Sequence, residues 1–267
     1  MSTAYPPRLV KYLFSSKKQR DAARTTPMKP GFYGNFPSTF GLYYLGHGTD
    51  FLSLNFLLAT LPSSTDSDPQ RQDLYAVTFH KGPGTVQCTI YSSLTHGSTP
   101  LAVATNEKRY GNHELINLPP SSGNSGPRTE RLTSSGFASN AHTFVWEGEQ
   151  FEIREEPKKR PKTIRVVHVS APSAASSDAQ GEEGRPVEPS GKHEETVTTW
   201  TEGSIPNREG RLAIFKFAES NPVERFGEAW GLFCVVATLA ICQRGAAIEG
   251  TRSWHEEKML EKGNFGK

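Results

Sequence analysis

The chain has few cysteines and none of the marks of a secreted, disulfide-bonded protein. Its three cysteines are Cys88, Cys234 and Cys242, and it contains no N-x-S/T glycosylation sequon. Cys234 and Cys242 lie eight residues apart in one apolar run, and a regular helix would keep them too far apart to bridge. We therefore interpret all three as small buried apolar residues, and we expect an intracellular protein, either cytoplasmic or peripheral at a membrane.

The chain is also poor in apolar side chains and has no strong excess of charge. Hydrophobic residues make up 35% of its 267 residues, whereas 24 glycines and 19 prolines indicate long loops. The net charge of +2 gives no reason to expect nucleic acid as a partner. The first residues contain no compact apolar stretch, so no signal peptide is expected.

No motif of a catalytic or metal centre is present in the sequence. The eight histidines show neither an H-E-x-x-H motif nor the spacing of a zinc site, and there is no G-x-S-x-G nucleophile elbow. Two His-Glu-Glu triplets, at 193–195 and 255–257, lie beside polar segments and are interpreted as solvated charge clusters. We expect a protein that is not an enzyme and that needs no cofactor and no metal.

One apolar run lies near the C-terminus. Residues 229–242 read AWGLFCVVATLAIC, in which Thr238 is the only polar residue. A helix that is apolar on every side must lie in a core or in a membrane. A helix of these 14 residues is about 21 Å long, shorter than the ~30 Å hydrocarbon layer of a bilayer. The length favours a buried helix; the alternative is a transmembrane helix at about 226–248 that anchors a soluble β domain.

Segments with strand-like alternation precede this run. Two pairs form expected hairpins: residues 74–80 with 85–91, and residues 142–146 with a strand after Glu147-Gly148-Glu149. The other candidates are residues 42–45, 51–60, 100–105, 113–118, 131–137, 162–170, 194–201 and 211–218. We predict an all-β fold in which about twelve antiparallel strands form a closed barrel around the C-terminal apolar helix. The helix residues Trp230, Phe233, Val236 and Leu239 are expected to meet inward side chains such as Val86, Ile90, Phe144 and Trp146.

The predicted barrel domain, residues 41–248, has polar regions at both ends and within it. Residues 1–40 contain seven lysines and arginines but a single acidic residue, Asp21, and are expected to be disordered. A mitochondrial presequence and a patch for anionic lipid are the other interpretations of this segment. Disordered insertions are expected near residues 62–72, 119–130 and 171–192, and residues 249–267 form a charged tail.

The order of these elements resembles that of one known family. The segments that carry the likeness are LYAVTFH with TVQCTIY, the hairpin FVWEGEQFEIR, and RLAIFKFAE followed by AWGLFCVVATLAIC. The chain resembles the tubby C-terminal-like superfamily, which includes tubby proteins, LURP-one-related proteins and phospholipid scramblases, over residues 41–248. The resemblance implies a closed barrel around a C-terminal helix. Many members of this superfamily have no assigned function, and this chain looks like one of them.

A basic cluster offers the one candidate binding site. Its side chains lie in one connection between strands and on the strand that follows: Lys158, Lys159, Arg160, Lys162 and Arg165. Such a cluster can dock on anionic lipid headgroups, although Glu155 and Glu156 weaken its field. The alternative is a solvated loop that protects a strand end. We predict a binding or adaptor module whose candidate partners are anionic phospholipid or a protein; the sequence does not determine its oligomeric state.

Overall fold

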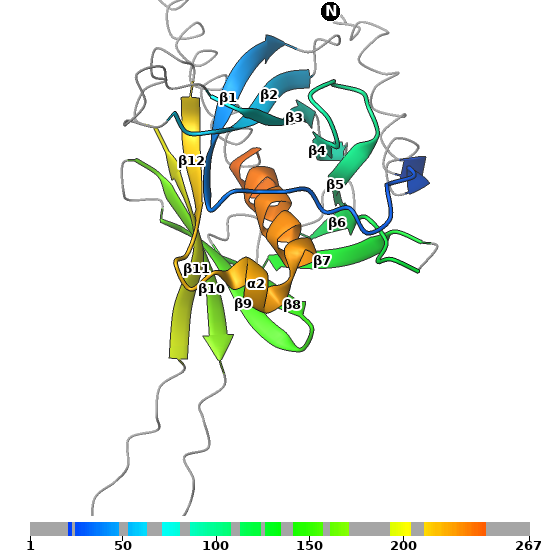
Figure 1. Ribbon diagram of the computed structural model, residues 1–267. Helices are drawn as coiled ribbons and strands as arrows, with labels where there is room; N and C mark the ends of the chain where they lie inside the picture. Colours follow the sequence, from blue (N-terminus) through cyan, green and yellow to red (C-terminus); the bar gives the residue numbers. More distant parts are fainter. Residues whose placement is uncertain are drawn as a thin grey trace, which may run out of the picture.

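Twelve antiparallel strands follow one another in sequence order around a closed barrel (Figure 1). The computed structural model describes residues 21–22, 25–47, 53–62, 71–80, 86–107, 113–123, 126–134, 141–156, 161–170, 193–203 and 211–243. The strands are β1 (Thr39–His47), β2 (Ser53–Thr60), β3 (Asp73–His80), β4 (Val86–Tyr91), β5 (Pro100–Asn106), β6 (Glu114–Leu118), β7 (Arg128–Ser134), β8 (Ala141–Trp146), β9 (Glu149–Glu156), β10 (Thr163–Ser170), β11 (His193–Glu202) and β12 (Arg211–Phe217). Pairing of β1 with β12 closes the sheet and removes its free edges, which confirms the predicted fold class.

Both expected hairpins are present. In the first, β3 pairs with β4 so that Val77 lies opposite Ile90 and Phe79 opposite Cys88. In the second, Trp146 of β8 lies opposite Glu149 of β9, and the two residues between them form the turn. These two, Glu147 and Gly148, have φ angles of 51° and 90°. Two consecutive positive φ angles match the right-handed twist of the flanking strands, which explains a glycine at this turn.

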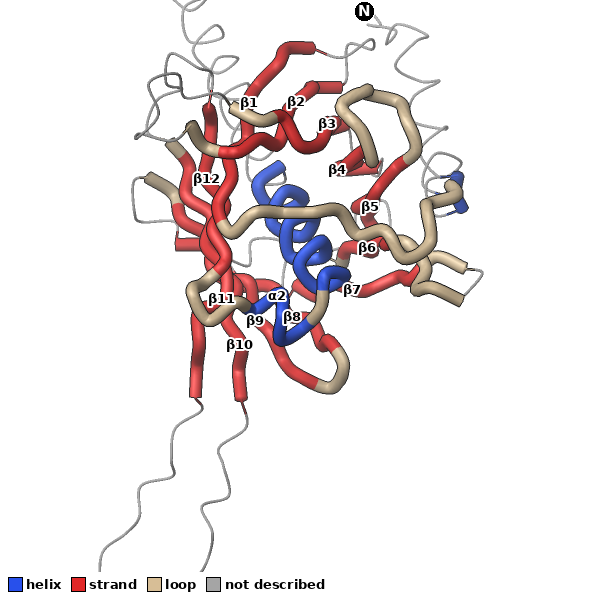
Figure 2. The backbone as a smooth tube through the Cα atoms, viewed as in Figure 1, coloured by secondary structure: helices blue, strands red, loops and turns tan. Residues whose placement is uncertain are grey.

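The apolar run forms a helix that occupies the barrel interior. Figure 2 shows this central helix surrounded by the strands. It covers residues 228–243, and every residue from Trp230 to Ile241 is buried. The Phe233 ring lies 4.5 Å from that of Phe144 and 5.7 Å from that of Trp146, as the sequence predicts for this helix. The helix is therefore a core element enclosed by the sheet. Among the described residues, no helix is both long and apolar enough to cross a bilayer.

The barrel has two distinct ends. At one end β12 is followed by the short helix α2 (Pro222–Phe226), which turns the chain into the central helix (Figure 1). We call this the α2 end. At the other end, which we call the helix-exit end, the Gln243 side-chain amide donates a hydrogen bond of 2.5 Å to the His80 carbonyl oxygen. Because every strand pair is antiparallel, odd-numbered strands begin at the α2 end and even-numbered strands begin at the helix-exit end.

An N-terminal strap, residues 28–38, crosses the α2 end before β1 begins (Figure 1). The Asn35 N–H donates to the Tyr75 hydroxyl at 2.6 Å, and the Phe217 N–H donates to the Ser38 carbonyl oxygen at 2.8 Å. The Phe36 ring packs 5.1 Å from that of Tyr75. The packed part of the chain thus extends N-terminally from the predicted residue 41 as far as the strap.

One predicted insertion is partly a strand. Residues 119–130 were expected to lie outside the sheet, but β7 begins at Arg128 and pairs with β6. The first residues of β7 alternate between two ion-paired charges, Arg128 and Glu130, and only Leu132 is a buried apolar residue, so the apolar alternation is weak. Residues 1–20, 63–70, 171–192 and 244–267, which contain most of the other predicted disordered segments, lie outside the described residues.

Candidate functional site

The predicted lipid site follows the end of β9 at the helix-exit end of the barrel. β9 ends at Glu156 and β10 begins at Thr163, so the basic connection joins these two strands at that rim. Lys158, Lys159 and Arg160 lie outside the described residues, whereas Lys162 and Arg165 are described. The contacts of the latter two decide which charges the cluster can offer to a ligand.

Lys162 is held in an ion pair at the rim. Its Nζ atom lies 2.5 Å from Glu155 Oε1, and both side chains are mostly buried. Burial alone would lower the pKa of Lys162, but the hydrogen bond and charge of Glu155, together with the charge of Glu202, outweigh it, so the pKa is raised. Lys162 therefore remains protonated at neutral pH and is used within the fold, which argues against the predicted contact with lipid.

Arg165 is also used within the fold. It lies on β10 and forms an ion pair with Glu156, the last residue of β9. Glu155 and Glu156 are the two acidic residues that were expected to weaken the field of the basic cluster. The structure pairs each of them with a basic residue, and the sequence has no other acidic residue between 157 and 165. The surplus positive charge of this region thus belongs to Lys158, Lys159 and Arg160.

Two arginines on the described outer wall of the barrel, Arg154 and Arg131, are ion-paired. Arg154 donates two hydrogen bonds of 2.7 Å to Glu194 and a third of 2.9 Å to Glu152. These hydrogen bonds, that with Glu194 first, raise the pKa of Arg154. The Arg131 guanidinium forms a similar pair with Glu107 at 2.9 Å. Such surface pairs contribute little to stability. Because each arginine is neutralised by a glutamate, the two do not add to the positive charge of the basic connection.

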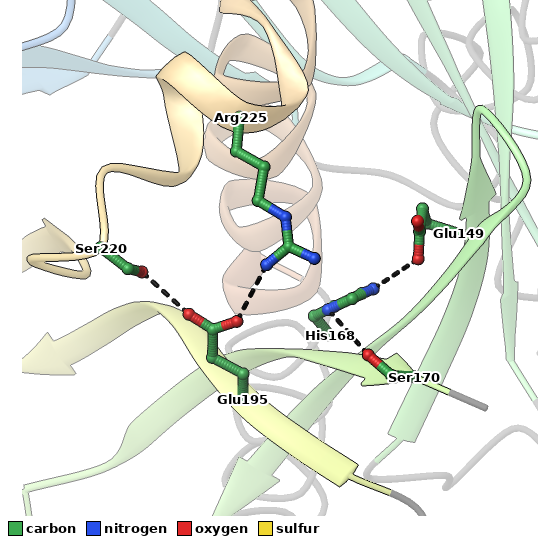
Figure 3. A network of polar contacts seen from close by, with 6 residues as sticks. All are labelled: Glu149, His168, Ser170, Glu195, Ser220 and Arg225. Atoms are coloured by element: carbon green, nitrogen blue, oxygen red, sulfur yellow. Dashed lines mark hydrogen bonds and ion pairs between the residues drawn. The ribbon is translucent and has the colours of Figure 1, made fainter. Parts of the chain in front are cut away.

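A second polar network lies at the α2 end, and Figure 3 shows its six side chains. Glu195 accepts a hydrogen bond of 2.9 Å from the Ser220 hydroxyl and one of 3.1 Å from Arg225 of α2. The 193–195 triplet is largely solvent-exposed, as expected for a solvated charge cluster, and the structure adds that Glu194 and Glu195 are each ion-paired. The partners of these two residues, Arg154 and Arg225, are 40 and 30 residues away in the sequence, so the local pattern could not indicate them. The triplet at 255–257 lies outside the described residues.

Part of this network has the connectivity of a hydrolytic triad. The Ser170 hydroxyl lies 3.4 Å from His168 Nδ1, and His168 Nε2 lies 2.7 Å from Glu149 Oε2 (Figure 3). In a triad the histidine is open to substrate and the acid is buried behind it. Here His168 is 2% exposed, with its ring near those of Phe151 and Phe226, whereas the Glu149 side chain is 49% exposed. The burial is the reverse of that in a triad, and His168 packs against Phe226 of α2.

The described residues offer little else for a ligand or a cofactor. They contain no group of three or more His, Cys, Asp or Glu side chains that could hold a metal ion. An open pocket of about 520 Å³ lies at the α2 end between residues 26–29 and 97–100, and Lys29 is its single charged residue. The contacts that sequence reasoning missed, those of Glu195 and His168, come from residues with ordinary strand patterns. The sequence therefore held no signal for them.

The basic connection is thus the candidate site, on the surface of a barrel whose interior is filled by its own helix. Comparisons with protein families, with curated proteins and with solved structures found no match for this chain. Membership of the tubby C-terminal-like superfamily therefore stays a prediction from the order of its elements.

Proposed function

We propose that this chain is a non-enzymatic binding module with a tubby-like barrel, which attaches to anionic lipid at a membrane surface. The observation that carries the proposal is the pairing of Glu155 with Lys162 and of Glu156 with Arg165. Because these two acids are paired, the net charge of +3 in residues 155–165 corresponds to the three basic residues Lys158, Lys159 and Arg160. Each basic residue near an anionic bilayer contributes about 1 kcal/mol, so three support weak, reversible and salt-sensitive attachment.

The filled barrel interior also supports binding at the outer surface. Barrels that carry a ligand in their interior keep a cavity there, whereas the central helix here is buried from Trp230 to Ile241. Trp230, Phe233 and Leu239 are each 0% exposed, which leaves them no water-filled space to share with a ligand. The loops and rims are then the parts of the molecule that remain for recognition.

Vesicle co-sedimentation tests the proposal with two variants that each lose two positive charges. Lys158→Ala with Lys159→Ala removes charge from the proposed site, and Lys29→Ala with Lys216→Ala removes the same charge at the α2 end. At low salt, the first pair should weaken binding to phosphatidylserine-containing vesicles by about 30-fold, since it removes about 2 kcal/mol. The control pair should bind like the wild type. Equal losses in both variants, or no binding of the wild type, would contradict the proposal.

A further inference from the structure

An irregularity in β1 exposes two adjacent large apolar side chains. Tyr44 lies opposite Phe56 of β2 and Gly46 lies opposite Asn55, so Leu45 is the extra residue of a β-bulge. Leu45 is 53% exposed and Tyr44 is 41% exposed. A bulge redirects side chains, and bulges are common at the rims of barrels. Exposure of two consecutive large residues therefore needs a reason beyond the fold.

The Tyr44 side chain packs on one side against a buried aromatic residue. Its ring lies 5.5 Å from that of Phe56, which in turn lies 4.5 Å from that of Phe79. Phe56 and Phe79 are both buried, so Tyr44 is the exposed end of an aromatic row that begins in the core. A ring that already packs against its neighbours loses less conformational entropy on binding than a free one. This lowers the free-energy cost of placing Tyr44 in a binding surface.

The bulge lies at the same end of the barrel as the basic connection. β1 runs from the α2 end to the helix-exit end, and Tyr44 and Leu45 are close to its last residue. Only β12 and β11 separate β1 from β10, where the basic connection ends. The other exposed large apolar residues of the described chain, Leu94 and Val145, lie singly at the α2 end, which is ordinary for a protein surface.

We propose that Tyr44 and Leu45 insert into the interfacial layer of an anionic bilayer, so that the helix-exit end faces the membrane. The inference rests on the proposed function and adds an apolar anchor to its electrostatic attraction. Stable peripheral attachment commonly needs two such signals. Tyrosine suits the headgroup region because its ring is apolar and its hydroxyl is polar.

Matched serine substitutions test the insertion. Leu45→Ser removes the proposed anchor, and Val145→Ser removes an apolar strand residue that is 62% exposed at the opposite end. Both sites are exposed, so both variants should fold. In co-sedimentation with phosphatidylserine-containing vesicles, Leu45→Ser should weaken binding by about tenfold, and its dependence on salt should equal that of the wild type. Val145→Ser should bind like the wild type.

A fluorescent label measures the insertion directly. An environment-sensitive dye on Leu45→Cys, with Cys242→Ser to avoid a second labelling site, should shift to shorter wavelengths on vesicles and be quenched by spin-labelled lipid. The same dye on Val145→Cys should do neither. Suppose that the wild type binds vesicles, that Leu45→Ser binds equally well and that the dye does not shift. The proposed insertion is then wrong, and Tyr44 and Leu45 would instead be candidates for contact with a protein. If the wild type does not bind at all, the proposed function fails and the insertion with it.

Discussion

At the scale of single residues, burial sets the chemistry of the cysteines. Cys88 and Cys234 are both 0% exposed, and burial raises the pKa of each thiol. The thiolate is the reactive form, so both thiols should be inert in the folded protein. This agrees with their interpretation as small apolar residues. It also gives a pH dependence, because a thiol that ionises only in the unfolded chain draws the equilibrium towards unfolding.

We expect a thiol reagent to label neither Cys88 nor Cys234 in native Cys242→Ser protein, and to label both in denaturant. Because folding raises these pKa values, their effect on stability is absent below the ordinary thiol pKa of about 8.5. The free energy of unfolding should fall as the pH rises above that value. Absorbance after addition of the reagent measures the labelling. Urea titrations below and above about pH 8.5 measure the change in the free energy of unfolding. Rapid labelling of the native protein would show that one thiol is accessible.

At the scale of elements, the continuous burial of the central helix from Trp230 to Ile241 leads us to expect that its packing is essential to stability. Leu239 is 0% exposed and faces the barrel interior, so Leu239→Ala should lower the free energy of unfolding by about 2–5 kcal/mol through lost burial and a cavity. Val236→Lys should cost more, because it would place an unpaired charge among apolar side chains. Urea unfolding followed by tryptophan fluorescence measures both. Val145→Ala is the control, and a loss for Leu239→Ala no larger than that of the control would contradict this packing.

The β10–β11 hairpin allows a test of the segment between its strands. Ser170 lies directly opposite His193, so the two ends of residues 171–192 are neighbours in the sheet. We expect a four-residue Gly/Ser loop to replace this segment without loss of stability. The shorter loop should even raise the free energy of unfolding, by about 1.5 kcal/mol at most. Thermal unfolding of the two forms decides this, and a large fall in Tm would show that the segment packs on the barrel.

At the scale of the whole molecule, barrel and helix should fold as one unit. The inward faces of the strands and the central helix belong to a single apolar core. Without the helix, the inward side chains of the strands would line an empty space and lose their packing partners. Removal of residues 222–267 should therefore leave a chain that is insoluble and has no near-UV dichroism. A soluble and cooperatively folded 1–221 would show that the sheet is stable without its helix.

The sequence by itself determined the strands and the buried helix, because both follow from local patterns. Alternation places Tyr75, Val77 and Phe79 on one face of a strand, and a run without charge has no solvent face. Only the tertiary structure decided which charges are paired. Glu195 forms an ion pair with Arg225, and Glu155 forms one with Lys162, between different segments of the chain. It also decided the path of the strap and the bulge at Leu45. Such contacts depend on register and closure, and the period of a single segment carries no information about them.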